Sequence, residues 1–128
     1  EIKRRLSLPG GWEGFVLLQD TREDGCGYDF LCKSNGQEVN LEVKTFTENG
    51  YVVVTSNELK SAARTRTDYY MVGVLSEESK PQSEWETFFI RDPINAILQS
   101  GTIHIQAEFG INAADLFRVK SPEMQKPE

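Results

Sequence analysis

The sequence lacks several features that would point to particular classes of protein. No apolar run approaches the ~20 residues that a membrane-spanning helix needs, and no signal peptide is visible, so we expect no contact with a membrane. The only cysteines, Cys26 and Cys32, are too few for a disulfide framework. They form neither a CxxC pair nor a Cys/His set for zinc. We therefore expect reduced thiols and a cytoplasmic protein, or a nuclear one if the source is eukaryotic.

Positive charge is also scarce. The 14 Lys and Arg residues stand against 20 Asp and Glu, which gives a formal net charge of -6. Binding of nucleic acid irrespective of sequence depends on Lys and Arg contacts with phosphates, so the chain as a whole is not expected to bind strongly in this way. A local basic groove, or a metal ion at the site itself, is compatible with this balance.

Two common kinds of catalytic site are missing as well. The single histidine, His104, lies far from the other candidate residues and gives no Ser/His/Asp or Cys/His nucleophilic set. No phosphate-binding loop of the GxxxxGK type occurs. Hydrolysis by a side-chain nucleophile and nucleotide binding by a P-loop are therefore not predicted.

A hairpin with charged residues on one face is what the sequence does contain, over residues 27–44. Asn35-Gly36 is a strong hairpin turn signal between two strands. In the second strand, apolar residues alternate with Glu42 and Lys44, which therefore share one face of the strand. Folding the hairpin back brings Asp29 beside them, so we predict that an Asp, a Glu and a Lys converge at one place.

The 128 residues fit one domain, which we expect to span residues 1–120 and to come from a larger protein, with a disordered tail over 121–128. Thr55 to Glu58 has the spacing of a capping box and predicts a helix start. Asp92-Pro93 predicts another. The near-continuous apolar run 69–75 predicts a strand buried on both faces, typical of a parallel neighbour reached through a helix.

The elements expected along the chain give the order (α)βββαβ followed by βαβα. This is an α/β (α+β) fold, a mixed sheet flanked by helices. The predicted helices cover residues 1–6, 55–65, 92–101 and 113–118. The predicted strands cover residues 12–18, the two arms of the hairpin, 51–55, 69–75, 85–91 and 102–106. The strand at 51–55 is expected to pair antiparallel with the second arm of the hairpin.

This order, with Asp29 in one strand and Glu42-Val43-Lys44 in the next, resembles the PD-(D/E)xK nuclease superfamily and its restriction-endonuclease-like fold. More narrowly, the segments GYDF, LEVKTF and VVVTSNEL, together with Asp92-Pro93, resemble the C-terminal domain of the NO VEIN family over roughly residues 12 to 100. Members of that family carry the domain fused to larger proteins.

The resemblance implies a Mg²⁺-dependent DNA endonuclease domain of a restriction, defence or DNA-processing protein. Asp29 and Glu42 would bind Mg²⁺, or Mn²⁺ in its place, with the carbonyl oxygen of Val43 as a further ligand. Lys44 would orient the attacking water or stabilise developing negative charge. Many members add a glutamate from the first helix, for which only Glu1 and Glu13 are available here. DNA and the other domains of a parent protein are the implied partners, and the sequence leaves open whether the domain acts as a homodimer.

Simpler interpretations stand beside these. The three charged residues can form an ion-pair cluster on an exposed hairpin face, and a catalytically silent module with this fold can serve recognition of nucleic acid or protein. Glu58 could be a further acidic group near the metal, but its capping box explains it more simply. Three weaker candidates for contact with nucleic acid are Tyr28, Asn57 and Lys60.

Overall fold

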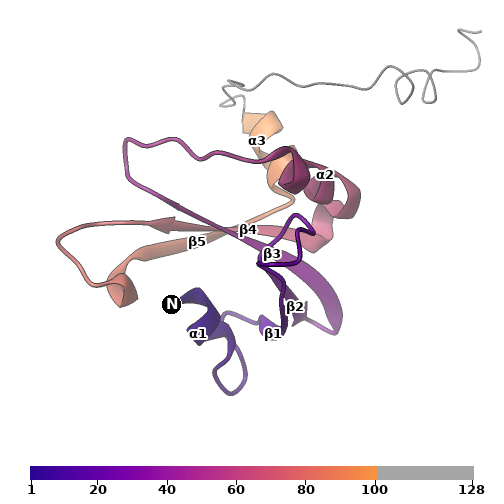
Figure 1. Cartoon of the computed structure of the whole chain (residues 1–128), viewed down its shortest axis with the longest axis horizontal. Helices are drawn as coiled ribbons and strands as arrows, with labels where there is room; N and C mark the ends of the chain where they lie inside the picture. The colour runs from indigo at the N-terminus through magenta and orange to yellow at the C-terminus, as the bar shows by residue number, and fades with distance from the viewer. Residues whose placement is uncertain (101–128) are drawn as a thin grey trace, which may run out of the picture.

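Five strands form one mixed sheet with the spatial order β1-β2-β3-β4-β5 (Figure 1). The computed structural model describes residues 1–100. The strands are β1 (Val16–Asp20), β2 (Phe30–Ser34), β3 (Gln37–Phe46), β4 (Tyr69–Leu75) and β5 (Glu86–Arg91). The helices are α1 (Ile2–Leu6), α2 (Ser56–Thr65), α3 (Pro93–Ser100) and the short 3₁₀ turns η1 (Arg66–Asp68) and η2 (Gln82–Glu84). The predicted order (α)βββαβ is confirmed, and β5 and α3 follow it.

The central hairpin forms as its turn predicts. Phe30 pairs with Leu41 and Ser34 with Gln37, which leaves Asn35 and Gly36 as the two-residue loop. Both loop residues have positive φ, 50° and 78°, as a turn that matches the twist of the flanking strands requires. The side chains of β3 alternate as expected, so one face carries the apolar residues Val39 and Leu41 and the other carries Glu42 and Lys44.

The apolar face of β3 packs against α1. Val39 and Leu41 are buried in one cluster with Ile2 and Leu6 of α1 and with apolar residues of β2 and β4. The opposite face, which carries Glu42, packs toward α2, whose Glu58, Ser61 and Ala62 are buried. In Figure 1, α1 accordingly lies on one side of the sheet, and α2 and α3 lie on the other.

The fourth strand is the parallel neighbour that its composition predicted. β4 runs parallel to β3 from the Asn40–Tyr69 pair to the Phe46–Leu75 pair, and α2 is the crossover between them. β5 then pairs antiparallel with β4 at the edge of the sheet.

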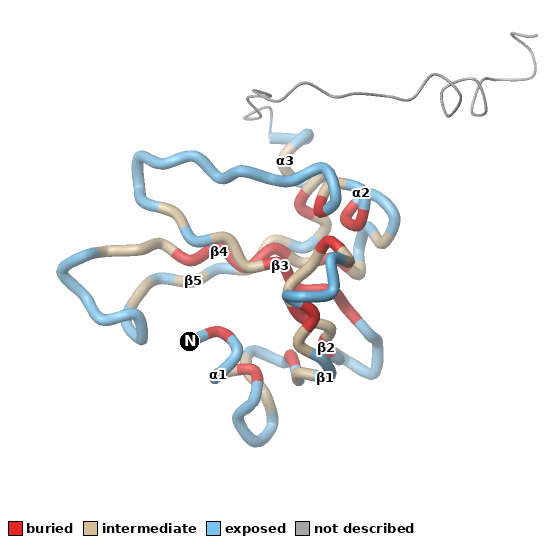
Figure 2. Tube along the Cα trace, viewed as in Figure 1, coloured by how far each residue is buried: buried red, intermediate tan, exposed pale blue. Residues whose placement is uncertain are grey.

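The prediction of a strand at 51–55 is wrong. This segment makes no strand, and it runs as an exposed connection from the end of β3 to α2 (Figure 2), with Tyr51 and Val53 more than 70% exposed. A following antiparallel strand would pair with residues 42–46 of β3, where β4 lies along one edge and, on the other edge, the Asp29 carboxylate already binds the Val43 N–H. The main-chain donor that an antiparallel third partner would use at the centre of this stretch is therefore taken.

The first strand begins later than its composition suggests. Trp12 and Phe15 close a tight turn through two backbone hydrogen bonds of 2.8 and 2.9 Å, so β1 starts only at Val16. Glu13 and Gly14 at the centre of this turn have positive φ. The predicted strand at 102–106 with His104, the helix at 113–118 and the tail at 121–128 lie outside the described residues.

Candidate functional site

The candidate site lies where β2 separates from β3. The ladder ends at the Phe30–Leu41 pair, whereas β3 continues to Phe46 with β4 as its partner. Continuing the register places Asp29 beside Glu42, and the Asp29 N–H donates to the Leu41 carbonyl at 2.9 Å. The Asp29 carboxylate then accepts the N–H of Val43 at 2.8 Å, in place of a strand carbonyl.

This bond fixes the orientation of Val43. In a strand, the N–H and the C=O of one residue point to the same edge. The Val43 carbonyl therefore lies on the edge that faces Asp29, beyond the end of the ladder with β2. The backbone and side-chain oxygens that the sequence singled out are thus brought to one stretch of β3.

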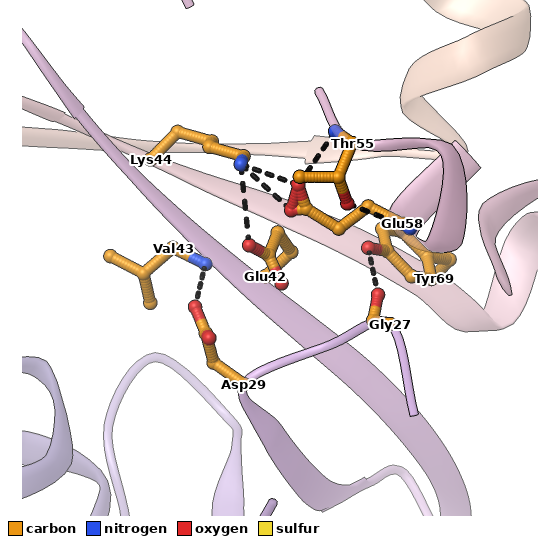
Figure 3. A network of polar contacts seen from close by, with 8 residues as sticks. All are labelled: Gly27, Asp29, Glu42, Val43, Lys44, Thr55, Glu58 and Tyr69. Carbon is orange, nitrogen blue, oxygen red and sulfur yellow. Dashed lines mark hydrogen bonds and ion pairs between the residues drawn. The ribbon is translucent and has the colours of Figure 1, made fainter. Parts of the chain in front are cut away.

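Lys44 lies on the same face of β3 as Glu42 and is held by two carboxylates. Its Nζ contacts both oxygens of Glu58, at 2.6 and 2.7 Å, and Oε1 of Glu42 at 3.5 Å. In Figure 3, Glu42 lies between Lys44 on one side and Asp29 on the other. The sequence interpretation that placed these charges on an exposed face is wrong, because Glu42 is only 6% exposed and α2 covers it.

Glu58 belongs to the site, although the sequence favours its capping box over a position near the metal. The capping box is confirmed: Thr55 Oγ1 accepts the Glu58 N–H, and Glu58 Oε1 accepts the Thr55 N–H at 3.0 Å. The same carboxylate also binds Lys44, so the capping role explains only part of its contacts. The helix start near Thr55 was predicted, but residues 47–55 separate β3 from α2, so no pattern in the sequence indicates that Glu58 reaches Lys44.

Burial and crowding of negative charge change the acidity of these groups. Burial, a hydrogen bond with Glu58 and the charge of Asp29 together raise the pKa of Glu42 from 4.5 to about 9. Burial also raises the pKa of Asp29, against the opposing effect of the Val43 N–H. For Glu58, burial acts upward, but the hydrogen bonds with Glu42 and Lys44 outweigh it and lower the pKa. Glu42 is therefore the carboxylate that holds a proton near neutral pH.

A pocket of about 160 Å³ opens at this cluster. The loop between β1 and β2 forms one wall, with Cys26 and Tyr28, while Glu42 and Glu58 form the other. Two hydrogen bonds hold this loop in place: Tyr69 Oη donates to the Gly27 carbonyl at 2.8 Å, and Asn57 Nδ2 donates to the Gly25 carbonyl at 2.6 Å.

Gly27 is the tightest point of that wall. Its φ is +88°, and a Cβ there would lie 2.5 Å from the carbonyl oxygen of Asn57 in α2. We expect Gly27→Ala to destabilise the domain by about 2 kcal/mol, because backbone atoms cannot give way as a flexible side chain can. Urea unfolding measures this effect. Gly25→Ala is the matched control, because Gly25 has a similar φ of +67° but open space around it. Equal losses in both variants would mean that strain at positive φ, and not the contact with α2, is responsible.

The remaining candidates from the sequence are scattered. Tyr28 lines the pocket, Asn57 serves to hold the loop, and Lys60 is exposed on α2. Of the two glutamates proposed for a first-helix ligand, Glu1 pairs with Arg4 at 2.7 Å and Glu13 is exposed in the Trp12–Phe15 turn. Within residues 1–100, no three His, Cys, Asp or Glu side chains are grouped so that they alone could hold a metal ion.

The fold and the site together define a mixed α+β domain with a buried carboxylate–lysine cluster at the open end of a hairpin. The family model described as "Protein NO VEIN, C-terminal" matches residues 12–88, which is more than half of the chain. The chain therefore belongs to the NO VEIN C-terminal family. The match includes the hairpin and α2 and ends before Asp92-Pro93. No curated protein and no solved structure matches the chain.

One further finding concerns membranes. Among the helices of residues 1–100, none has the length and apolar character that crossing a membrane requires.

Proposed function

We propose that this domain hydrolyses phosphodiester bonds in DNA as a Mg²⁺-dependent endonuclease of the PD-(D/E)xK type, within a larger restriction, defence or DNA-processing protein. One observation carries the proposal. Lys44 contacts the carboxylates of Glu42 and Glu58 at the open end of the β2–β3 hairpin, Asp29 lies beside Glu42, and burial together with these neighbouring carboxylates raises the pKa of Glu42 to about 9. A buried carboxyl group with a strongly raised pKa that lines a pocket is typical of functional sites.

The donor atoms suit Mg²⁺. This ion prefers oxygen ligands and is commonly bound by one or two carboxylates, with water completing its shell. Asp29 and Glu42 supply the carboxylates and Val43 supplies a carbonyl oxygen on the same edge of β3. A group of three acidic side chains is therefore not needed. When bound, such an ion lowers the pKa of a coordinated water and stabilises negative charge on phosphate oxygens.

The residues of the chain would then act as follows. Asp29 is oriented by the Val43 N–H, which holds one of its oxygens while the other is available to a ligand. Lys44 supplies a compact positive charge within 3.5 Å of Glu42, where it would orient the attacking water or stabilise charge on the phosphate. Glu58 holds the Lys44 ammonium in this position through two short bonds.

A second candidate function is a catalytically silent module that recognises nucleic acid or protein. The observation in its favour is that the Lys44 ammonium donates hydrogen bonds to both oxygens of Glu58. The charge of the lysine is thus compensated within the protein, without a phosphate. On that interpretation the cluster stabilises the crossover from β3 to α2, and the domain binds no metal ion specifically.

Asp29→Asn is the variant that separates these functions. The amide oxygen can still accept the Val43 N–H, so the fold should persist while one negative charge is lost. We expect Mg²⁺-dependent cleavage of plasmid or linear DNA by the unaltered domain, and a loss of about 100-fold or more in the variant. Asp24→Asn, on an exposed carboxylate of the same loop, is the control and should cleave normally. Cleavage that survives Asp29→Asn, or that proceeds in excess chelator, would contradict the nuclease proposal.

A further inference from the structure

A second cavity, of about 250 Å³, lies on the other side of Asp29. It is enclosed by α1, by the sheet and by the segment around η2. Asp29 and Arg22 line both this cavity and the pocket at Glu42, so the two meet at Asp29. We call the larger cavity the cationic groove, because Lys3, Arg5 and Arg22 line it.

The groove has a surplus of positive charge in a chain that is acidic overall. Lys3 and Arg22 share one carboxylate, that of Asp20, at 3.1 and 2.7 Å. Arg5 likewise shares the carboxylate of Glu1 with the neighbouring Arg4. With Asp29, which also lines the groove, four cationic side chains lie among three carboxylates, a surplus of one positive charge. The Lys3 and Arg22 side chains are also about half exposed, so an incoming phosphate can reach them.

The groove also offers an aromatic wall. Trp85 lines it, and the indole N–H donates to the carbonyls of Glu77 and Lys80, at 2.9 and 3.0 Å. These two bonds fix the ring in one orientation. Cationic side chains next to a fixed aromatic ring are the combination with which proteins bind single-stranded nucleic acid, through phosphates and by stacking on bases.

We propose that the cationic groove binds a single strand of DNA beside the bond to be cut, with its phosphates at Lys3 and Arg22 and a base against Trp85. This inference rests on the proposed function. It assigns the strand to the α1 side of Asp29, away from Asn57 and Lys60 on α2. The acidic balance of the chain is thereby reconciled with DNA as substrate, because the positive charge is concentrated in the groove that leads to the site.

Salt dependence of binding tests the groove without any cleavage. A fluorescein-labelled single-stranded oligonucleotide is titrated in EDTA at several KCl concentrations, with anisotropy as the readout. Each phosphate contact on a single strand contributes ~0.7 to the slope of log K against log salt. We expect the double variant K3Q/R22Q to bind more weakly, with a slope shallower by about 1.4. The control K33Q/K60Q removes the same charge from exposed positions on β2 and α2 and should keep the slope.

Tryptophan fluorescence gives a second readout that does not depend on those variants. We expect the oligonucleotide to quench the emission of the unaltered domain and of W12F, but to quench W85F much less. An equal change of slope in both double variants, or no binding of the oligonucleotide, overturns the proposal that the groove binds single-stranded DNA. Cleavage with an unchanged slope rejects the groove and leaves the nuclease standing, whereas a changed slope without cleavage supports the groove and rejects the nuclease.

Discussion

Glu42→Gln is expected to make the domain more stable above neutral pH while it abolishes cleavage. The side chain is buried, and it lies beside the carboxylates of Asp29 and Glu58, with Lys44 as the one cation in contact among residues 1–100. A neutral amide of the same shape removes the cost of ionising this position. The same change removes a carboxylate that the proposed Mg²⁺ site requires, so stability and activity should move in opposite directions.

The pH dependence follows from the direction of the shift. The pKa of Glu42 rises from 4.5 in the unfolded chain to about 9 in the fold. Over that range the folded state keeps a proton that the unfolded state has lost, so stability falls as pH rises from 4.5 toward 9. A shift of this size corresponds to several kcal/mol, at ~1.4 kcal/mol for each pH unit. The lowered pKa of Glu58 acts in a separate window, below 4.5, where its contribution is lost as pH falls.

Urea unfolding at about pH 5, 7 and 9 measures this dependence. We expect Glu42→Gln to flatten the profile of the unaltered domain and to have the higher free energy of unfolding at the alkaline end. Glu38→Gln is the matched control, because Glu38 is an exposed carboxylate on the same strand. A Glu42→Gln domain that is less stable at every pH would show that Glu42 serves as a structural ion-pair partner.

Lys44→Ala is expected to reduce both the cleavage activity and the stability of the domain. The ammonium contacts Glu42 and Glu58, and its removal leaves the buried Glu58 carboxylate without its cation, beside Glu42. Breaking a buried pair by removing one partner costs about 3–5 kcal/mol. We also expect cleavage to fall by about 100-fold or more, because the charge that would act on the phosphate is gone.

A second substitution separates the two losses. In Lys44→Ala with Glu58→Gln, the negative charge of Glu58 that lost its cation is removed as well. We therefore expect the domain to recover much of its stability without recovering cleavage. Lys33→Ala, at an exposed position on β2, controls for the general effect of removing a lysine. If the double variant cleaves DNA as the unaltered domain does, Lys44 has no catalytic part.

Much of this site is predictable because it is local. The Asn35-Gly36 turn determines the hairpin register, and that register places Asp29 beside Glu42. Because side chains alternate along a strand, Lys44 lies on the same face of β3 as Glu42. The contact between Glu58 and Lys44 joins residues 14 apart across the start of a crossover, which a pattern read along the sequence does not pair. The error at 51–55 has a related origin, since β propensity alone does not show that β4 lies along one edge of residues 42–46 and that Asp29 binds the Val43 N–H on the other.

Charge distribution shows the same difference between sequence and structure. The net charge of -6 is a property of the whole chain and gives no sign of the groove. Only the fold brings Lys3 of α1 and Arg22 of the β1–β2 loop onto the same carboxylate, that of Asp20. Lys3 and Arg22 are polar residues far apart in the sequence, and no sequence pattern indicates that they approach the same carboxylate.

The most direct test of the central claim is anomalous diffraction from crystals of the domain soaked in Mn²⁺, which can take the place of Mg²⁺. We expect a peak bound by the carboxylates of Asp29 and Glu42 and by the Val43 carbonyl, and no such peak in crystals of Glu42→Gln. Crystals of the unaltered domain without such a peak, in which Lys44 still bridges Glu42 and Glu58, would rule out the metal site and identify the cluster as a structural ion-pair network.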